Sequence, residues 1–227
     1  MRWCRSESAL SMTWLSYCQD QVSTVKSSRD CFYSMLGLME IIEAPFSRLD
    51  EFARISIAFE VRSVFEPVLL ENGLGGIRLE ERPVTAYQKD YDQLDPPSSW
   101  PVRFDVSNWR LLLATRAGQL LGGVAMAWHT PGASMLDGRQ DLAVLWDLRV
   151  QPQARGQGVG RSLFAQAVAW SKARGCAQMK IETQNTNVPA CRFYAAQGAR
   201  LGDMRRFAYR AEPSIAQEVQ LIWYFDC

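Results

Sequence analysis

The sequence of 227 residues has a single histidine, His129, and no two cysteines at C-x-x-C spacing. A zinc site needs about four Cys, His or carboxylate ligands at close spacing, so we expect no metal centre of the usual kind. No apolar run approaches the roughly 18 residues of a membrane span, and the segment 9–15 is too interrupted by polar residues for a secretory signal. We therefore expect a cytoplasmic protein with no membrane partner, whose six cysteines are free thiols.

The sequence also has no excess of positive or of negative charge. The chain carries 25 basic and 24 acidic residues, a formal net charge of +1, which argues against a nucleic-acid partner held by broad electrostatics. Its 48% hydrophobic residues are typical of a soluble globular domain. Residues 1–38 are rich in Ser, Cys and Trp without periodicity, and we interpret them as a poorly ordered N-terminal extension of a domain at 39–227. Alternatively, residues 35–38 belong to a short helix packed on that domain.

Hydrophobic periodicity and turn residues divide the rest of the chain. We expect a strand from Met39, a helix over 48–72 that Pro67 breaks or kinks, and a surface loop over 95–101 near the active site. The further expected strands are 77–81, 110–116 and 120–128 as a hairpin, 142–150, 177–183, 206–210 and 218–225, with helices over 162–174 and from Asn187 to Gly198.

Glycines at 156, 158 and 160 stand between the strand 142–150 and the helix that follows. They allow a tight turn whose N–H groups converge where the helix dipole is positive, a site suited to a diphosphate. A P-loop would need Lys after Gly160, and a dinucleotide fingerprint would need Gly-x-Gly-x-x-Gly early in the chain. The Arg/Gln-x-x-Gly-x-Gly/Ala pattern does fit. A plain turn with a helix cap is the alternative.

Residues 142–198 resemble the GNAT superfamily of acetyl-CoA-dependent N-acetyltransferases, through this loop and the later Asn187, Ala190 and Tyr194, which share one helix face. More narrowly, residues 145–150, 181–191 and 218–224, with the upstream segments 59–65 and 87–91, resemble streptothricin acetyltransferases. The resemblance covers about residues 39–227. It implies an α/β fold with a central mixed, mostly antiparallel twisted sheet of six to seven strands and helices on both faces.

The resemblance also implies acetyl-CoA as co-substrate, with no metal. The main chain near Leu148, Arg149 and Val150 would bind the pantetheine arm at a place where two strands splay apart, and Asn187, Ala190 and Tyr194 would adjoin it. The diphosphate would lie on the loop, where backbone amides and an arginine supply the contacts. Its residues are Arg155, Gly156, Gln157, Gly158, Val159, Gly160, Arg161 and Ser162.

Tyr194 stands where the family places the general acid beside the CoA sulfur; a core tyrosine is the alternative. An unperturbed tyrosine of pKa near ~10 can protonate a thiolate of pKa ~8.5. Many relatives carry a Glu base where this chain has Trp146. Asp147 is our first candidate for the base and Glu182 the second, with a water chain as a further option. Each carboxylate could instead form a salt bridge, with Arg149 or Lys180.

The predicted activity is direct acetyl transfer, in a ternary complex, to a primary amine of a small molecule, such as a streptothricin-type antibiotic. A cationic acceptor requires an acidic lining, and the candidates are Asp90, Asp92, Asp95, Asp137, Asp141 and Asp147. Six aromatic residues could wall the pocket: Trp100, Trp109, Trp128, Trp146, Trp223 and Tyr224. The alternatives are a peptide or protein N-acetyltransferase and a non-catalytic acyl-CoA sensor. The sequence leaves the oligomeric state open, a homodimer included.

Overall fold

The computed structural model describes residues 37–227. By their contacts the described residues form two units, one of residues 37–40 with Thr115–Gln119 and a larger one of Ile41–Ala114 with Leu120–Cys227. The larger unit contains most of the sheet, the described helices and the cavities of the site. The predicted N-terminal extension, residues 1–38, lies almost entirely outside the described residues.

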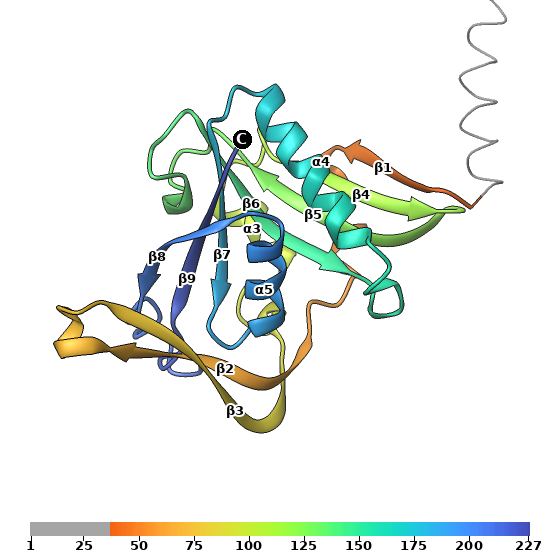
Figure 1. The fold of residues 1–227 in the computed structure, drawn as a ribbon. Coiled ribbons are helices and arrows are strands. Elements are labelled where there is room, and N and C mark those ends of the chain that lie inside the picture. The colour runs from red at the N-terminus through yellow and green to blue at the C-terminus, as the bar shows by residue number, and fades with distance from the viewer. Residues whose placement is uncertain (1–36) are drawn as a thin grey trace, which may run out of the picture. The chain divides into compact units, whose positions relative to one another are not determined.

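A seven-stranded mixed sheet organises the larger unit (Figure 1). In spatial order the strands are β1 (Met39–Ala44), β4 (Arg110–Arg116), β5 (Gln119–Ala127), β6 (Leu142–Val150), β7 (Gln178–Gln184), β9 (Gln220–Asp226) and β8 (Arg200–Arg205). β6 pairs with β7 in parallel, whereas the pairs β5–β6, β7–β9 and β8–β9 are antiparallel. This confirms the predicted fold class.

Helices cover both faces of this sheet, as two adjacent glycines of β5 demonstrate. A Cβ at Gly122 would stand 3.1 Å from Leu163 of the helix α4 (Val159–Ala173), whereas one at Gly123 would stand 2.9 Å from Phe52 of the helix α2 (Leu49–Ala53). Successive strand residues face opposite sides, so α4 and α2 lie on opposite faces.

The helices are α2 (Leu49–Ala53), α3 (Trp100–Arg103), α4 (Val159–Ala173) and α5 (Val188–Ala196). The 3-10 turns are η1 (Phe46–Arg48), η2 (Leu70–Gly73), η3 (Tyr91–Gln93), η4 (Pro97–Ser99), η5 (Ser134–Leu136) and η6 (Pro152–Ala154).

No helix in residues 37–227 has the length and apolar character needed to cross a membrane. The expected surface loop over 95–101 contains η4 and the first two residues of α3. The hairpin of β4 and β5, the strand β6 and the helix–strand–helix run from α4 to α5 lie close to their predicted bounds.

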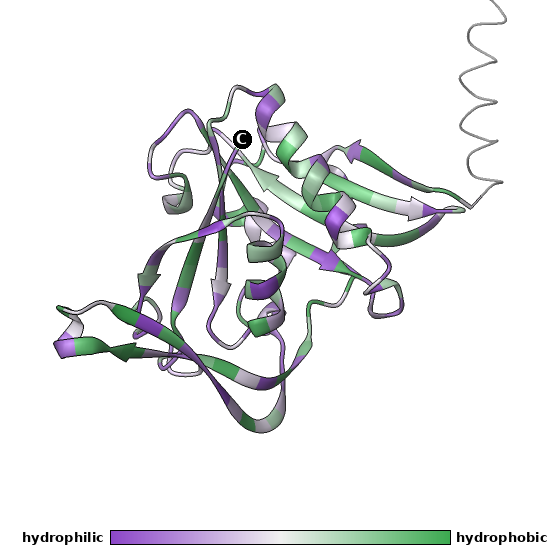
Figure 2. Cartoon of the chain, in the orientation of Figure 1, coloured by the Kyte–Doolittle hydropathy of each residue, from purple (hydrophilic) through white to green (hydrophobic). Residues whose placement is uncertain are grey.

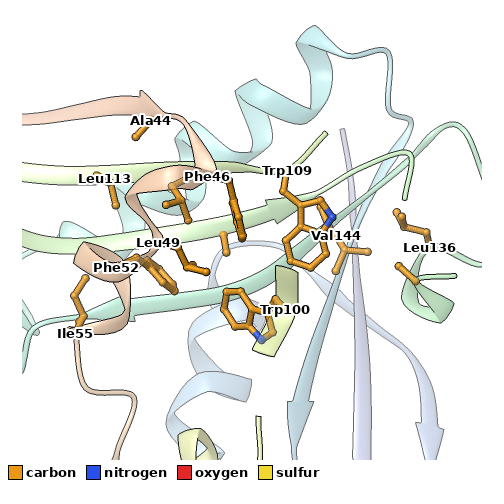
Figure 3. Packing of buried hydrophobic residues seen from close by; sticks show 14 residues of the cluster. Ala44, Phe46, Leu49, Phe52, Ile55, Trp100, Trp109, Leu113, Leu136 and Val144 are labelled. Carbon is orange, nitrogen blue, oxygen red and sulfur yellow. The ribbon is translucent and has the colours of Figure 1, made fainter. Parts of the chain in front are cut away.

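An aromatic core fills the face covered by α2 and α3 (Figure 3). Phe52, Trp100 and Trp109 are fully or almost fully buried there, and the Trp100 and Trp109 ring centroids lie 6.1 Å apart. Trp146 of β6 packs on the edge of this cluster, 4.7 Å from the Trp109 ring centroid. Truncating such a side chain to alanine costs about 3–5 kcal/mol of folding free energy, so this cluster fixes the strand that carries the site.

The predicted helix over 48–72 is wrong. Only α2 is α-helical there, with 3-10 turns at the two ends of the range, and Phe59–Leu69 forms β2, paired antiparallel with β3 (Ile77–Lys89) in a two-stranded ribbon. Pro67 is tolerated because a two-stranded ribbon leaves one edge of each strand without a ladder partner. Hydrophilic and hydrophobic residues follow one another along both strands (Figure 2).

The predicted strand over 206–210 is also wrong. These residues form turns, and the strand of this region, β8, ends at Arg205. The segment between β8 and β9 lies beside the active site, where Tyr209 and Ile215 line a cavity.

Candidate active site

Two neighbouring strands part at the centre of the sheet. β6 and β7 pair from Leu142 and Gln178 only as far as Leu145 and Ile181. Beyond that point β6 continues beside β5 and β7 continues beside β9. A register shift between β5 and β6 leaves Trp146 as an extra residue in β6, which is a β-bulge. The bulge redirects the side chains, and both Trp146 and Asp147 line the same cavity.

On one side of the parted strands lies a cavity of about 500 Å³, here called the donor cavity. It is formed by the end of β6, the glycine loop, the start of α4 and one face of α5. Its lining includes most of the residues predicted to bind the coenzyme: Leu148, Arg149, Val150, Arg155, Gly156, Gly158, Gly160, Arg161, Asn187, Ala190 and Tyr194. Gln157, Val159 and Ser162 are predicted residues that do not line it.

The glycine loop has the conformation that its sequence requires. Gly156 and Gly158 have φ angles of 75° and 84°, where a side chain is strained, and Gly158 is the N-cap of α4. Ser162 donates its amide to the Gly158 carbonyl at 3.0 Å. The amides of Val159 and Gly160 have no acceptor among residues 37–227, as expected in the first turn of a helix. These donors and the helix dipole suit a diphosphate.

Arg155 and Arg161 have different surroundings. The Arg155 guanidinium donates to the Val150 carbonyl at 3.1 Å and, at longer range, to the carbonyls of Ser56 and Ala58. It therefore joins the loop to the segment before β2. Arg161 is exposed at the rim of the donor cavity, and so it is the more available of the two for contact with a phosphate.

Helix α5 forms the opposite wall of the donor cavity. The Asn187 side chain caps it by accepting the Ala190 amide at 3.2 Å, and Gly198, with φ 93°, follows its end. Asn187 therefore caps α5 and also lines the cavity. Cys191 faces the interior, 3.3 Å from the Thr183 hydroxyl, and burial raises the pKa of its thiol to about 11.

Tyr194 lines the donor cavity. The residue is 6% exposed, and its hydroxyl makes no hydrogen bond within the described residues 37–227. Burial, with a smaller contribution from the charge of Asp147, raises the pKa of Tyr194 above its ordinary value. The hydroxyl therefore stays protonated throughout the neutral range and can act as a proton donor.

A second cavity of about 300 Å³, here called the acceptor cavity, opens where the strands part. It shares Ile57 and Arg149 with the donor cavity. Its charged lining consists of four carboxylates and one cation: Asp92, Asp95, Asp147, Glu182 and Arg149. Trp100 and Trp146 are the aromatic candidates that line it, whereas Asp90, Asp137 and Asp141 do not. The acidic excess suits a cationic ligand.

Arg149 is buried between two of these carboxylates, with its side chain 1% exposed. It donates to Asp147 at 2.7 Å and to both oxygens of Asp92 at 2.6 and 2.7 Å. A further hydrogen bond reaches the Ile55 carbonyl at 3.1 Å. Four of its five guanidinium N–H groups are therefore engaged within the protein.

Asp147 has the perturbed titration expected of a catalytic acid or base. Burial raises the pKa of Asp147 to about 6, although Arg149 opposes the shift. The carboxylate is therefore mostly ionised at neutral pH and able to accept a proton. The alternative of a salt bridge with Arg149 is also realised, and the two interpretations are compatible.

Glu182 has a different environment. Its Oε1 accepts hydrogen bonds from the Tyr209 hydroxyl at 2.5 Å and the Gln184 amide at 3.1 Å. Lys180, the other cation considered for a salt bridge, pairs with Asp137 at 2.8 Å. The sequence did not indicate Tyr209 or Ile57 as site residues, because their positions depend on the irregular segments around 55–58 and 206–219.

The profile of the acetyltransferase (GNAT) family matches residues 77–199. The streptothricin acetyltransferase of Escherichia coli is 31% identical over 172 residues, which are 74% of this chain and 84% of that protein. The chain belongs to the GNAT acetyltransferase family. It is accordingly an acetyl-CoA-dependent N-acetyltransferase.

Two solved structures show the same fold. One, assigned as a streptothricin acetyltransferase from Bacillus anthracis and solved with acetyl coenzyme A, has a TM-score of 0.66 at 26% identity, covering 84% of this chain and 100% of that one. The nourseothricin acetyltransferase structure has a TM-score of 0.63 at 23% identity, covering 83% of this chain and 98% of that one. The GNAT fold thus extends over most of the described residues.

Proposed function

We propose that this GNAT enzyme acetylates a primary amine of a small cationic molecule of the streptothricin type, by direct transfer between two substrates bound together. The observation that carries the proposal is the junction of the two cavities. An acidic acceptor cavity meets the donor cavity beside Asp147 and Arg149, with Tyr194 on the donor side. The similarity to streptothricin acetyltransferases supports the same substrate class.

The residues that would hold acetyl-CoA fit its chemistry. The diphosphate would accept hydrogen bonds from the first-turn amides of α4, with Arg161 adding charge. The main chain of Leu148 and Val150 would bind the pantetheine arm, because β6 no longer pairs with β7 there. Bound in this way, acetyl-CoA supplies an activated acyl group at the junction of the cavities. We place the whole catalytic domain at residues 39–227.

Asp147 and Tyr194 would divide the proton transfers. Asp147 accepts a proton from the acceptor ammonium, leaving the neutral amine as nucleophile. As the C–N bond forms and the C–S bond breaks, Tyr194 donates its proton to the leaving sulfur, and the second proton that the nitrogen releases returns the tyrosine to its neutral form. The pKa of Asp147 is about 6, whereas burial raises the pKa of Tyr194 above its ordinary value, so the two environments keep the pKa values apart. At neutral pH the two groups are therefore in the protonation states that these roles need.

Cys191 favours direct transfer over a covalent acetyl-enzyme. It is the cysteine nearest the site in the described residues, but it is 1% exposed and its thiol pKa is raised to about 11. A thiol that is both buried and protonated is a poor nucleophile. Transfer would then occur within a ternary complex.

The proposal is tested by following thiol release from acetyl-CoA with streptothricin as acceptor. We expect saturable turnover, mass spectrometry showing one added acetyl group, and double-reciprocal plots that intersect, as a ternary complex requires. Turnover restricted to peptide amines would favour a peptide N-acetyltransferase. Tight acetyl-CoA binding without turnover across a broad amine panel would favour an acyl-CoA sensor. Parallel plots would contradict direct transfer.

A further inference from the structure

The carboxylates of the acceptor cavity are not equivalent. Asp92 and Asp147 share the buried guanidinium of Arg149, and Asp95 is paired with Arg103 and accepts the Ser99 hydroxyl at 2.7 Å. Glu182 has no cationic partner among residues 37–227; both of its hydrogen-bond donors are neutral groups. One carboxylate of the cavity therefore lacks a counter-charge.

The position of Glu182 separates it from the proposed reaction centre. It lies on β7 one residue beyond Ile181, the last residue that pairs with β6, whereas Asp147 lies on β6 past the bulge. Paired strands are about 4.8 Å apart and these two have begun to diverge, so the two carboxylates come from separate strands and both line the acceptor cavity. Asp147, and not Glu182, contributes to the raised pKa of Tyr194.

Hydrogen bonds from its neighbours fix the orientation of the Glu182 carboxylate. Tyr209 and Gln184 both donate to Oε1, which fixes the carboxylate, and Tyr209 itself lines the cavity. Oε2 takes part in neither bond. A half-buried carboxylate without a counter-ion is stabilised most by a cation that brings its own charge and N–H donors, which describes an alkylammonium.

We propose that Glu182 is the anchoring site for a second ammonium group, so that the preferred acceptors are diamines with one amine at Asp147 and the other at Glu182. This rests on the proposed function and narrows its substrate class to short molecules with two cationic amines. It also assigns Glu182 a binding role in place of the base role considered from the sequence. A monoamine would leave Glu182 unpaired, and so would bind more weakly.

The test compares putrescine with butylamine, which has the same carbon chain and one amine fewer. Binding of each is measured with CoA present, by the fluorescence of Trp100 and Trp146 in the cavity wall. We expect putrescine to bind the wild-type enzyme at least tenfold more tightly than butylamine. In Glu182→Gln, which keeps an acceptor for Tyr209, that preference should fall to less than threefold. The exposed Glu71→Gln serves as the matched control for charge and should keep the preference.

Equal binding of the two amines to the wild-type enzyme, or an undiminished preference in Glu182→Gln, overturns the inference. Because binding is measured without acetyl transfer, the result is independent of turnover. If streptothricin is not acetylated but the Glu182-dependent preference is found, the proposed function fails and the ammonium site stands. If streptothricin is acetylated but no preference is found, the proposed function stands and the ammonium site at Glu182 fails.

Discussion

The Arg149 guanidinium donates to the Asp147 carboxylate at 2.7 Å inside the protein, with the two side chains 1% and 8% exposed. Arg149 also binds Asp92, so one cation holds two carboxylates of the acceptor cavity. A buried charge that loses its partner is costly, and the pair therefore links the stability of the fold to the titration of the proposed base.

Arg149→Met should destabilise the protein and make Asp147 harder to ionise. Removing the one cation leaves two carboxylates close together, and we expect a loss of about 3–5 kcal/mol in the free energy of unfolding. Denaturant unfolding measures it. Arg205→Met, which breaks the exposed pair with Asp203, is the matched control and should cost less than about 1 kcal/mol. Similar losses in both variants would contradict this account of Arg149.

The pH dependence of kcat/KM should show an acid limb with an apparent pKa close to that of Asp147, which is about 6. The base must be ionised, so activity falls as pH drops through this value, about tenfold per unit. Asp147→Asn should lower kcat by roughly 10²–10⁴ and abolish the limb. The exposed Asp141→Asn should keep it. A limb that persists in Asp147→Asn would assign the base to another group.

Arg149→Met should also move this limb to higher pH, provided that the variant folds. Arg149 is the group that lowers the pKa of Asp147 against the effect of burial, so its loss leaves burial and the negative charges of Asp92 and Asp95 unopposed. The pH profile of the folded fraction measures the shift. An unmoved limb would mean that Arg149 serves the fold alone.

Tyr194→Phe should lower kcat by roughly 10²–10⁴ while the Kd of acetyl-CoA changes little, because only the proton donor is removed. Steady-state kinetics and calorimetry measure the two quantities. Tyr87→Phe, at an exposed position of the β2–β3 ribbon, is the matched control. An unchanged kcat in Tyr194→Phe would exclude the tyrosine as the acid.

The contiguous part of the site was predictable because its signals are local. The glycines at 156, 158 and 160 and the cap at Asn187 each act within one turn of chain, and the elements that they bound lie where expected. The partnership of Arg149 with Asp92 was not predictable, because the two residues are 57 positions apart in the chain. It depends on how η3 folds back onto β6.

The errors have the same physical origin. The residues of β2 were assigned to a helix because strand pairing with β3 is a tertiary contact that overrides local propensity. The bulge at Trp146 interrupts the alternation of side chains along β6, which in a regular strand would place Trp146 and Asp147 on opposite faces. Residues 206–210 alternate as a strand would, yet they lie in the turns that bring Tyr209 to Glu182.

Gly158→Val should weaken acetyl-CoA binding at least tenfold. Position 158 has φ 84°, which a β-branched side chain resists, so the loop must move and its amides lose their common direction. Gly76→Val, at φ 101° beside the ribbon turn, imposes comparable strain far from the cavity and is the matched control. It should lower stability without altering coenzyme affinity. Normal affinity in Gly158→Val would show that the loop tolerates the change.

The central claim, that main-chain amides at the start of α4 bind the coenzyme diphosphate, is tested most directly by titrating the ¹⁵N-labelled enzyme with acetyl-CoA and following its amide resonances. The account predicts that the amides of Gly158, Val159 and Gly160 shift most, and that pantetheine, which has no diphosphate, leaves them unmoved. Large shifts confined to other parts of the chain, with these three amides unchanged, would contradict it.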